Sequence, residues 1–248
     1  MSGHSKWASI KHKKKAVDAK RGALFTKLTR AITVAARDGG DPEANPTLAL
    51  AVQKARDASM PKDNIERAIA KGTGADSDAD AYEAVMYEGY GPGGVAILVE
   101  ALTDNRNRTG SEVRHAFTSH GGSLGEPGSV AWTFEKKGEV VVDGQRYEED
   151  DLLAAIDAGA EDVSIDEDVY EIVTAPADLT AVSEALEEAG IELQSADLAM
   201  EPKSAVEVGE GDARRLMQLM EALDEHDDVD AVHANFDSPA EVLEAVSA

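Results

Sequence analysis

The sequence contains no cysteine and few aromatic residues, and both scarcities limit what the chain can be. Without cysteine it has no disulfide, no thiolate nucleophile and no cysteine-based zinc site. Phe, Trp and Tyr make up 4% of the 248 residues, whereas hydrophobic residues as a whole reach 42%. Mainly aliphatic side chains fit several small cores better than one large core. We therefore expect two or three small domains.

Long apolar runs are also missing. No stretch of eighteen apolar residues occurs, so the sequence predicts no membrane-spanning helix. The basic N-terminus leads into polar residues and not into the apolar core of a signal peptide. Serine, not glycine, follows Met1, so the N-myristoylation pattern does not apply. We therefore expect a cytoplasmic protein that has no membrane partner.

The chain is strongly acidic, yet its first part is basic. The formal net charge of -25 comes from 24 Lys and Arg against 49 Asp and Glu. Residues 1–71 hold 15 basic and 7 acidic residues, whereas residues 72–248 hold 9 basic and 42 acidic residues. Such asymmetry is typical of a basic element that contacts a polyanion and is attached to an acidic body. For the body itself, a solvated acidic surface is the simpler interpretation.

Hydrophobic periodicity predicts a small helical domain at the start of the chain. Apolar residues recur at three- and four-residue steps over 24–35, which is the period of a helix. The Asn-Pro pair at 45–46 is a typical helix start, and a Pro and a Gly bound a shorter helix over 61–72. We assign residues 1–75 to this domain. The Gly/Asp/Ser-rich stretch 72–81 is expected to be a linker.

Beyond the linker, the pattern changes to strands alternating with helices. Residues 138–200 read as β-α-β-β-α-β, the order of a ferredoxin-like unit. Strands predicted at 93–102 and 128–135, with a helix at 106–119 that Asn105 is expected to cap, belong to a second unit that this insertion interrupts. The predicted fold class is α+β, with an N-terminal all-helical domain followed by two ferredoxin-like α+β domains, the third inserted in the second. The predicted boundaries are 1–75 for the helical domain, 82–135 plus 203–240 for domain 2, and 136–202 for domain 3.

Two motifs resemble ligand-binding loops but lack the required context. "GYGPGG" (89–94) satisfies G-x-G-x-x-G, yet a strand follows where a dinucleotide site needs a helix, and Pro92 removes an amide donor. We expect a tight β-turn or bulge there instead. "DSDADAYE" (76–83) starts like an EF-hand loop, but Ala81 and Tyr87 occupy the places of its Gly and Glu. The six histidines show no zinc-binding spacing, and no nucleophile motif occurs. We expect no catalytic residue, metal, cofactor or small-molecule substrate, and hence no enzyme.

The N-terminal arm carries the residues best suited to nucleic acid. Lysine and arginine neutralise phosphates and release counterions, which favours binding without sequence readout. The Trp7 ring offers a face on which an unpaired base can stack, and nearby histidines can add hydrogen bonds. The predicted contact residues are His4, Lys6, Trp7, Lys11, His12, Lys13, Lys14, Lys15, Lys20, Arg21, Lys27 and Arg30.

Two further groups of basic residues leave alternatives open. Arg106, Arg108 and Arg114 are three of the nine basic residues in the acidic body, and they suit either local salt bridges or a second polyanion contact. The helices predicted at 46–60 and 62–71 carry side chains that suit a duplex-DNA recognition helix. These side chains are Lys54, Arg56, Lys62, Asn64 and Arg67.

Several long motifs resemble the YebC family, also described as YebC/PmpR transcriptional regulators, whose mitochondrial members are described as translational activators of cytochrome c oxidase. The resemblance runs from residue 2 to about 237. The motifs are "GHSKWASIKHKKKAVDAKRGALFTKL", "MPKDNIERAIAKGTG", "YEGYGPGGVAILVEALTDNRNRT", "GGSLGEPGSVAWTFEKKG" and "NFD".

The resemblance implies a helical N-terminal domain, two α+β domains and no reaction of its own. It also implies two alternative roles. One is a ribosome-associated translation factor that relieves stalling on proline-rich nascent chains, with the arm from Gly3 to Lys20 near ribosomal RNA and tRNA. The other is a transcriptional regulator that binds promoter DNA. His233 stands where family members often carry Tyr, and the acidic body is expected to be repelled by duplex DNA.

Overall fold

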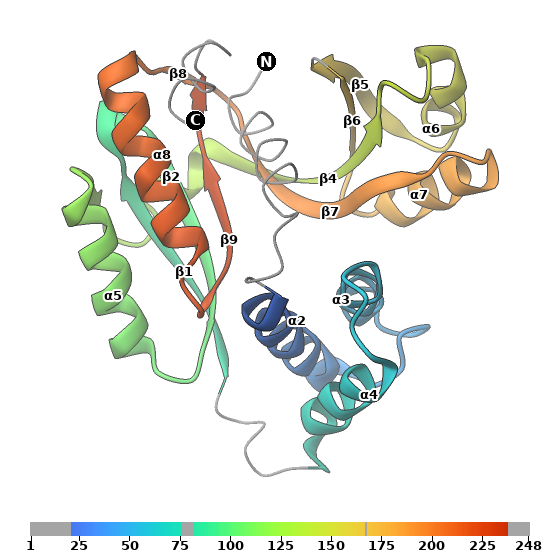
Figure 1. The fold of residues 1–248 in the computed structure, drawn as a ribbon, viewed down its shortest axis with the longest axis horizontal. Helices are drawn as coiled ribbons and strands as arrows, with labels where there is room; N and C mark the ends of the chain where they lie inside the picture. Colours follow the sequence, from blue (N-terminus) through green and yellow to red (C-terminus); the bar gives the residue numbers. More distant parts are fainter. Residues whose placement is uncertain (1–20, 76–81, 167, 238–248) are drawn as a thin grey trace.

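The structure is a computed structural model that describes residues 21–75, 82–166 and 168–237 (Figure 1). Within these ranges helices come first, and two four-stranded antiparallel sheets follow. The predicted α+β class is confirmed. None of the helices in the described ranges is both long and apolar enough to cross a membrane.

The first unit consists of helices. In chain order its elements are α2 (Arg21–Ala35), η2 (Ala36–Asp38), α3 (Pro46–Asp57), α4 (Lys62–Ala70) and η3 (Lys71–Ala75). The predicted Asn-Pro helix start is confirmed, because the Asn45 side chain accepts a hydrogen bond from the Leu48 amide at 3.1 Å. The same side chain donates to the Ala35 carbonyl at 2.8 Å. It therefore fixes the turn between α2 and α3 as well as the start of α3.

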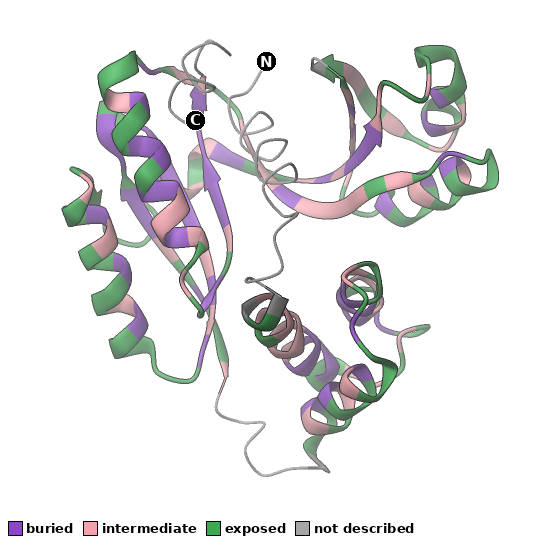
Figure 2. Cartoon of the chain, in the orientation of Figure 1, coloured by how far each residue is buried: buried purple, intermediate pink, exposed green. Residues whose placement is uncertain are grey.

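The first sheet joins strands from distant parts of the chain in the order β3-β1-β2-β9. The elements of this unit are β1 (Glu83–Tyr90), β2 (Ala96–Thr103), α5 (Arg106–Ser119), β3 (Ser123–Leu124), α8 (Glu210–Asp224) and β9 (Val229–Ala234). A short parallel pair of strands, β8 (Val206–Glu207) and β10 (Phe236–Asp237), adjoins them. Helices α5 and α8 cover one face, and their inner sides are buried with the strands (Figure 2). Phe117 and Leu216 are fully buried in this core.

The turn between β1 and β2 is the predicted Gly-rich motif. It contains η5 (Pro92–Gly94), in which Gly93 and Gly94 have φ of 75° and 79°, a region that favours glycine. Because this turn joins β1 directly to β2, the unit runs β-β-α-β and ends with α8 and β9. This is not the β-α-β-β-α-β order of a ferredoxin-like unit, so the ferredoxin-like class predicted for this unit is not confirmed. The tight turn predicted at 89–94 is confirmed.

The second sheet has the strand order β5-β6-β4-β7. Its elements are β4 (Phe134–Asp143), η7 (Glu149–Leu152), α6 (Leu153–Asp157), β5 (Ala160–Asp166), β6 (Val169–Thr174), α7 (Leu179–Glu188) and β7 (Leu193–Pro202). Along the chain this is β-α-β-β-α-β, the order that the sequence predicts. Helices α6 and α7 pack against Val140, Val142 and Ile172, so they cover one face of the sheet.

The strand predicted at 128–135 is wrong, and a buried carboxylate explains why. Residues up to Thr133 form turns and η6 (Ala131–Thr133), and β4 begins only at Phe134. The Glu88 carboxylate, on β1, accepts hydrogen bonds from the amides of Gly128, Val130 and Ala131 at 2.6, 2.7 and 2.8 Å. These amides are therefore directed to one side chain and not to a neighbouring strand.

Replacing Glu88 by glutamine is expected to lower the free energy of unfolding by about 2 kcal/mol, because a buried charged acceptor is lost from three amides. Burial raises the pKa of Glu88, but the three backbone hydrogen bonds outweigh burial and leave that pKa below its ordinary value. This stabilisation is therefore present at neutral pH and is lost as the pH falls through the lowered pKa. Denaturant unfolding of Glu88→Gln, with exposed Glu83→Gln on the same strand as control, measures the effect.

Candidate nucleic-acid interface

The part of the predicted interface with the highest positive charge precedes the described residues. The described chain begins at Arg21, where α2 starts, so the arm joins the protein at this helix. The predicted contacts that lie outside the described ranges are His4, Lys6, Trp7, Lys11, His12, Lys13, Lys14, Lys15 and Lys20. Their role in binding stays a prediction.

Two predicted contact residues on α2, Lys27 and Arg30, have partners within the protein. The Lys27 ammonium donates a hydrogen bond to the Asp224 carbonyl at 2.5 Å. The Arg30 guanidinium donates to the Asp227 carbonyl at 2.5 Å and pairs with the Asp228 carboxylate at 3.0 Å. These contacts attach α2 to the connection between α8 and β9, and so fix the position from which the arm leaves.

Asp228 is the centre of this attachment. It is only 4% exposed, and its carboxylate accepts hydrogen bonds from the Arg108 guanidinium and the Thr109 hydroxyl, both at 2.7 Å, in addition to its ion pair with Arg30. Burial raises the pKa of Asp228, but these hydrogen bonds and the two positive charges keep the pKa below its ordinary value. One carboxylate therefore links the helical unit, α5 and β9.

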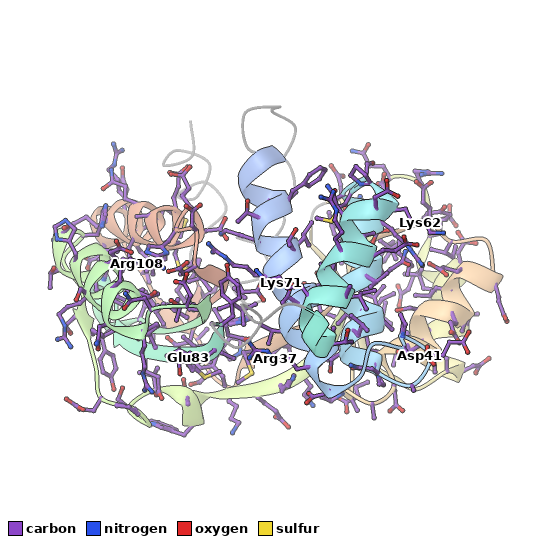
Figure 3. The ribbon with its side chains drawn as sticks, turned by 90° about the horizontal axis from the view of Figure 1, so that it is seen from below. Arg37, Asp41, Lys62, Lys71, Glu83 and Arg108 are labelled. Atoms are coloured by element: carbon purple, nitrogen blue, oxygen red, sulfur yellow. The ribbon has the colours of Figure 1, made fainter. Side chains whose placement is uncertain are left out.

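In the second group of predicted contacts, on α5, Arg108 has acidic partners within the protein. Arg108 also pairs with Asp104 at 2.9 Å, so local salt bridges, one of the two interpretations left open, account for its charge. Arg106 and Arg114 are exposed on the same helix. Figure 3 shows Arg108 and Lys62 on opposite sides of the molecule, with α2 between them. The basic residues of α4 and α5 therefore form no continuous patch among the described residues.

The basic side chains of α3 and α4, which suited a recognition helix, are largely paired. Lys54 reaches across to β7 and pairs with Asp197 at 2.8 Å. Lys62 pairs with a glutamate one turn further along α4, and the Arg67 guanidinium donates to the Asn64 side chain. Arg56 is exposed near the end of α3. Lys62 and Arg67 nevertheless remain exposed, so a role of these helices in DNA recognition stays a prediction.

Two cations of the helical unit also contact an aromatic ring. The Arg30 guanidinium and the Lys71 ammonium each lie 5.6 Å from the centroid of the Tyr82 ring, which directly precedes β1. Cation–π contacts of this length stabilise the junction between the helical unit and the first sheet. No pattern in the sequence indicates this contact, because Arg30 lies far along the chain from Lys71 and Tyr82.

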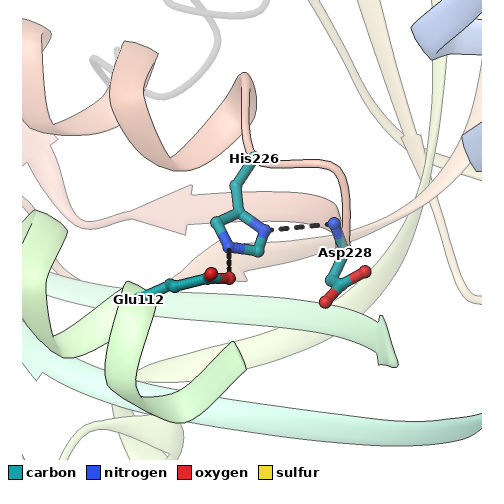
Figure 4. A group of neighbouring side chains, drawn as sticks. All are labelled: Glu112, His226 and Asp228. Carbon is teal, nitrogen blue, oxygen red and sulfur yellow. Dashed lines mark hydrogen bonds and ion pairs between the residues drawn. The ribbon is translucent and has the colours of Figure 1, made fainter. Parts of the chain in front are cut away.

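Glu112, His226 and Asp228 lie close together and are the candidate metal ligands of the described part (Figure 4). One ligand atom from each lies within 4.8 Å of the others. The His226 Nδ1 accepts a hydrogen bond from the Asp228 amide at 3.1 Å, so its Nε2 carries the proton and donates to Glu112 at 2.9 Å. With both ring nitrogens engaged, this cluster is better described as part of the Asp228 network than as a metal centre.

Most cations of the described residues thus have partners within the protein, whereas the arm lies outside the described ranges. Two family models match nearly the whole chain, namely "TACO1/YebC protein N-terminal domain" over residues 5–75 and "TACO1/YebC second and third domain" over residues 82–236. The chain belongs to the TACO1/YebC family. The resemblance found in the sequence motifs is confirmed.

Relatives in this family are similar over their full length. A "Probable transcriptional regulatory protein" of Rubrobacter xylanophilus is 59% identical, and the match covers 100% of both chains. A protein of the same description from Acidothermus cellulolyticus is 55% identical over 99% of this chain and 100% of its own. The crystal structure of a conserved hypothetical protein, Aq1575 from Aquifex aeolicus, superposes with a TM-score of 0.88 at 50% identity. The match covers 96% of this chain and 99% of the Aquifex chain.

Proposed function

We propose that this TACO1/YebC protein is a non-enzymatic, cytoplasmic regulator of gene expression that binds RNA on the ribosome through its N-terminal arm. In this role it relieves stalling on proline-rich nascent chains, as the family resemblance implies. Ribosomal RNA and tRNA are then its partners, and the arm residues from His4 to Lys20 are the main contacts.

The distribution of charge carries this proposal. Residues 1–20 contain six lysines and one aspartate, whereas residues 21–248 contain 18 basic and 48 acidic residues. The cations Lys27, Arg30, Lys54 and Arg108 have partners inside the described protein. A polyanion would therefore be attracted to the arm and repelled by most of the remaining surface.

The chemistry of the arm favours structured or single-stranded RNA over duplex DNA. A duplex presents a broad phosphate surface, and contact with it would bring the acidic body close to many phosphates. A narrow basic segment can reach into RNA while the body stays outside. Trp7 adds a ring on which an unpaired base can stack, which a closed duplex does not offer.

A DNA-binding transcriptional regulator is the second candidate, because the relatives from Rubrobacter and Acidothermus are named probable transcriptional regulatory proteins. In that role the exposed Arg56, together with Lys62 and Arg67, would approach the DNA. Pairing of Lys62 and Arg67 within α4 makes direct base readout by these two side chains less favourable.

We also propose that the chain divides into domains at the boundaries the sequence predicts, 1–75, 82–135 plus 203–240, and 136–202. The sheet order β7-β4-β6-β5 and the chain order β-α-β-β-α-β support a ferredoxin-like third domain. Separate buried clusters in the helical unit and in each sheet support the division.

The salt dependence of binding tests the proposal against its alternative. If about six phosphates are neutralised, the logarithm of the association constant for single-stranded RNA should fall with the logarithm of salt concentration at a slope of about −4. Fluorescence anisotropy with RNA and with duplex DNA of matched sequence measures both slopes. Tighter binding to the duplex, with a steeper slope, would favour the transcriptional alternative.

A further inference from the structure

A pocket lies between α2, the end of the helical unit and the residue that precedes β1. Its volume is about 220 Å³. Sites that enclose a whole small molecule usually measure about 300–1,000 Å³, so this pocket suits one part of a larger ligand. None of the described residues that line it is acidic, which favours an anion even in a chain of net charge -25. The polar residues of the lining include Thr26, Thr29, Arg30, Lys71 and Tyr82.

Arg30 offers a donor to this pocket although it also has partners within the protein. Its contacts with the Asp227 carbonyl and the Asp228 carboxylate both use Nη1. The Nε is buried without a hydrogen-bond partner, and Nη2 has no partner among the described residues. The two aspartates therefore hold the guanidinium in place, and Nη2 is the group that can donate to a ligand.

Lys71 supplies the positive charge that the described protein does not balance. Its ammonium lies 5.6 Å from the centroid of the Tyr82 ring, and no ion pair joins it to a carboxylate within the described ranges. The Arg30 guanidinium lies at the same distance from this ring, so both cations are held near one place. Both side chains are half-buried, and contacts of such groups with an anion are screened less than contacts at an exposed surface.

The threonines of α2 add hydrogen-bond acceptors to the same pocket. The hydroxyls of Thr26 and Thr29 each donate to the carbonyl one turn earlier in α2, at 3.0 and 2.7 Å. Because the hydroxyl protons are used inside the helix, the two oxygens offer lone pairs to a ligand. A ligand that matches the whole pocket therefore carries an anionic group beside a hydroxyl that donates.

We propose that this pocket binds one ribose-phosphate unit of a single RNA strand. The phosphate accepts hydrogen bonds from Lys71 and from Nη2 of Arg30, and the ribose 2′-hydroxyl donates to a threonine oxygen. This hydroxyl is the group by which a protein distinguishes RNA from DNA. The choice of a strand over a free nucleotide rests on the proposed RNA contact. The arm ends where α2 begins, and the two threonines follow within about two turns of that helix.

Amide NMR signals of the full chain test the pocket, with a short oligouridine as the probe. At low salt we expect the signals of Lys71 and Tyr82 to shift and to saturate as the probe is added. These two residues lie far along the chain from the arm, so binding at the arm alone does not account for their shifts. Unmoved signals of both residues, whether or not the arm responds, would overturn the proposal.

A matched pair of charge variants shows whether the pocket or the general charge is responsible. Lys71→Gln should lower the affinity read from the Tyr82 signal about tenfold, because a charged hydrogen bond to the phosphate is lost. Lys136→Gln removes the same charge from β4, which contributes no residue to the pocket, and should change the affinity less than about twofold. Equal losses in the two variants would overturn the assignment to this pocket.

The sugar contact is tested with an oligodeoxyuridine of the same length. The unmodified protein should bind it about fivefold more weakly than the oligouridine at this site, because one neutral hydrogen bond is missing. In the double variant Thr26→Val, Thr29→Val, the two strands should bind equally, since valine keeps the shape of threonine and lacks its oxygen. Equal affinities for the two strands in the unmodified protein would overturn the ribose contact.

Uridine 5′-monophosphate and inorganic phosphate separate the strand from free ligands. Both should move the signals of Lys71 and Tyr82 but bind at least about tenfold more weakly than the oligouridine, because neither reaches the arm at the same time. Binding of either one as tight as that of the oligouridine would overturn the strand as the ligand.

Ribosome association distinguishes failure of this proposal from failure of the proposed function. Shifts of the Lys71 and Tyr82 signals with oligouridine, in a protein that does not associate with ribosomes, would refute the proposed function and support the pocket. Ribosome association without those shifts would refute the pocket and leave the proposed function intact.

Discussion

Replacing Lys13, Lys14 and Lys15 together by glutamate is expected to lower the affinity for single-stranded RNA at least about a hundredfold. Three phosphate contacts are lost and three negative charges are placed beside the RNA, so both counterion release and direct attraction decrease. The cores of the described domains consist of side chains from other parts of the chain. Thermal unfolding of the variant should therefore remain close to that of the unmodified protein.

A matched variant on the helical unit shows whether position or total charge matters. Arg56→Glu, Lys62→Glu and Arg67→Glu change the net charge by the same amount but lie on α3 and α4. If the arm is the contact, this variant should lose only about a few-fold in RNA affinity through long-range repulsion. A large loss here, with little loss in the arm variant, would contradict the arm as the interface and favour the recognition-helix alternative.

Replacing Asp228 by asparagine is expected to lower the free energy of unfolding by about 3 kcal/mol, because two guanidinium groups lose a shared buried carboxylate. For a chain of this size, that loss corresponds to a fall in Tm of roughly 9 °C. The helical unit should also separate from the α8–β9 connection, since Arg30 of α2 pairs with this carboxylate. Calorimetry measures the first effect, and small-angle scattering measures the second as an increase in the radius of gyration.

The neighbouring Asp227 provides the control, since it is exposed and contributes only its backbone carbonyl to Arg30. Asp227→Asn should therefore unfold like the unmodified protein. Because the pKa of Asp228 is lowered, its contribution is present at neutral pH and is lost as the pH falls through that lowered pKa. Equal unfolding of the two variants would refute the role of Asp228 as the attachment point.

Local signals in the sequence predicted much of the fold. Helical periodicity in the following residues predicted Asn45 and Asn105 as helix caps. In the structure, the side chain of each accepts the expected backbone hydrogen bond. The turn at 89–94 could be predicted because the pattern after this Gly-rich motif is that of a strand and not of a helix. These features depend on residues close together in the chain, and such features are the ones that a single sequence expresses.

The failures have a common cause in contacts between distant segments. Glu88 lies about forty residues before the amides that it binds, so the segment at 128–133 looked like an ordinary strand. The partners of Lys27 and Arg30 follow nearly two hundred residues later, at Asp224 to Asp228. Composition placed these cations with the basic arm, but folding brings acidic residues to them. Only the three-dimensional arrangement shows that these two cations have partners within the protein.

The most direct test of the account is ribosome association in a sucrose gradient. The unmodified protein should sediment with ribosomes at low salt and leave them as the salt concentration rises, because its contact is electrostatic. The Lys13→Glu, Lys14→Glu, Lys15→Glu variant should stay at the top of the gradient. Failure of the unmodified protein to sediment with ribosomes at any salt concentration, together with salt-sensitive binding to a defined promoter, would contradict the account.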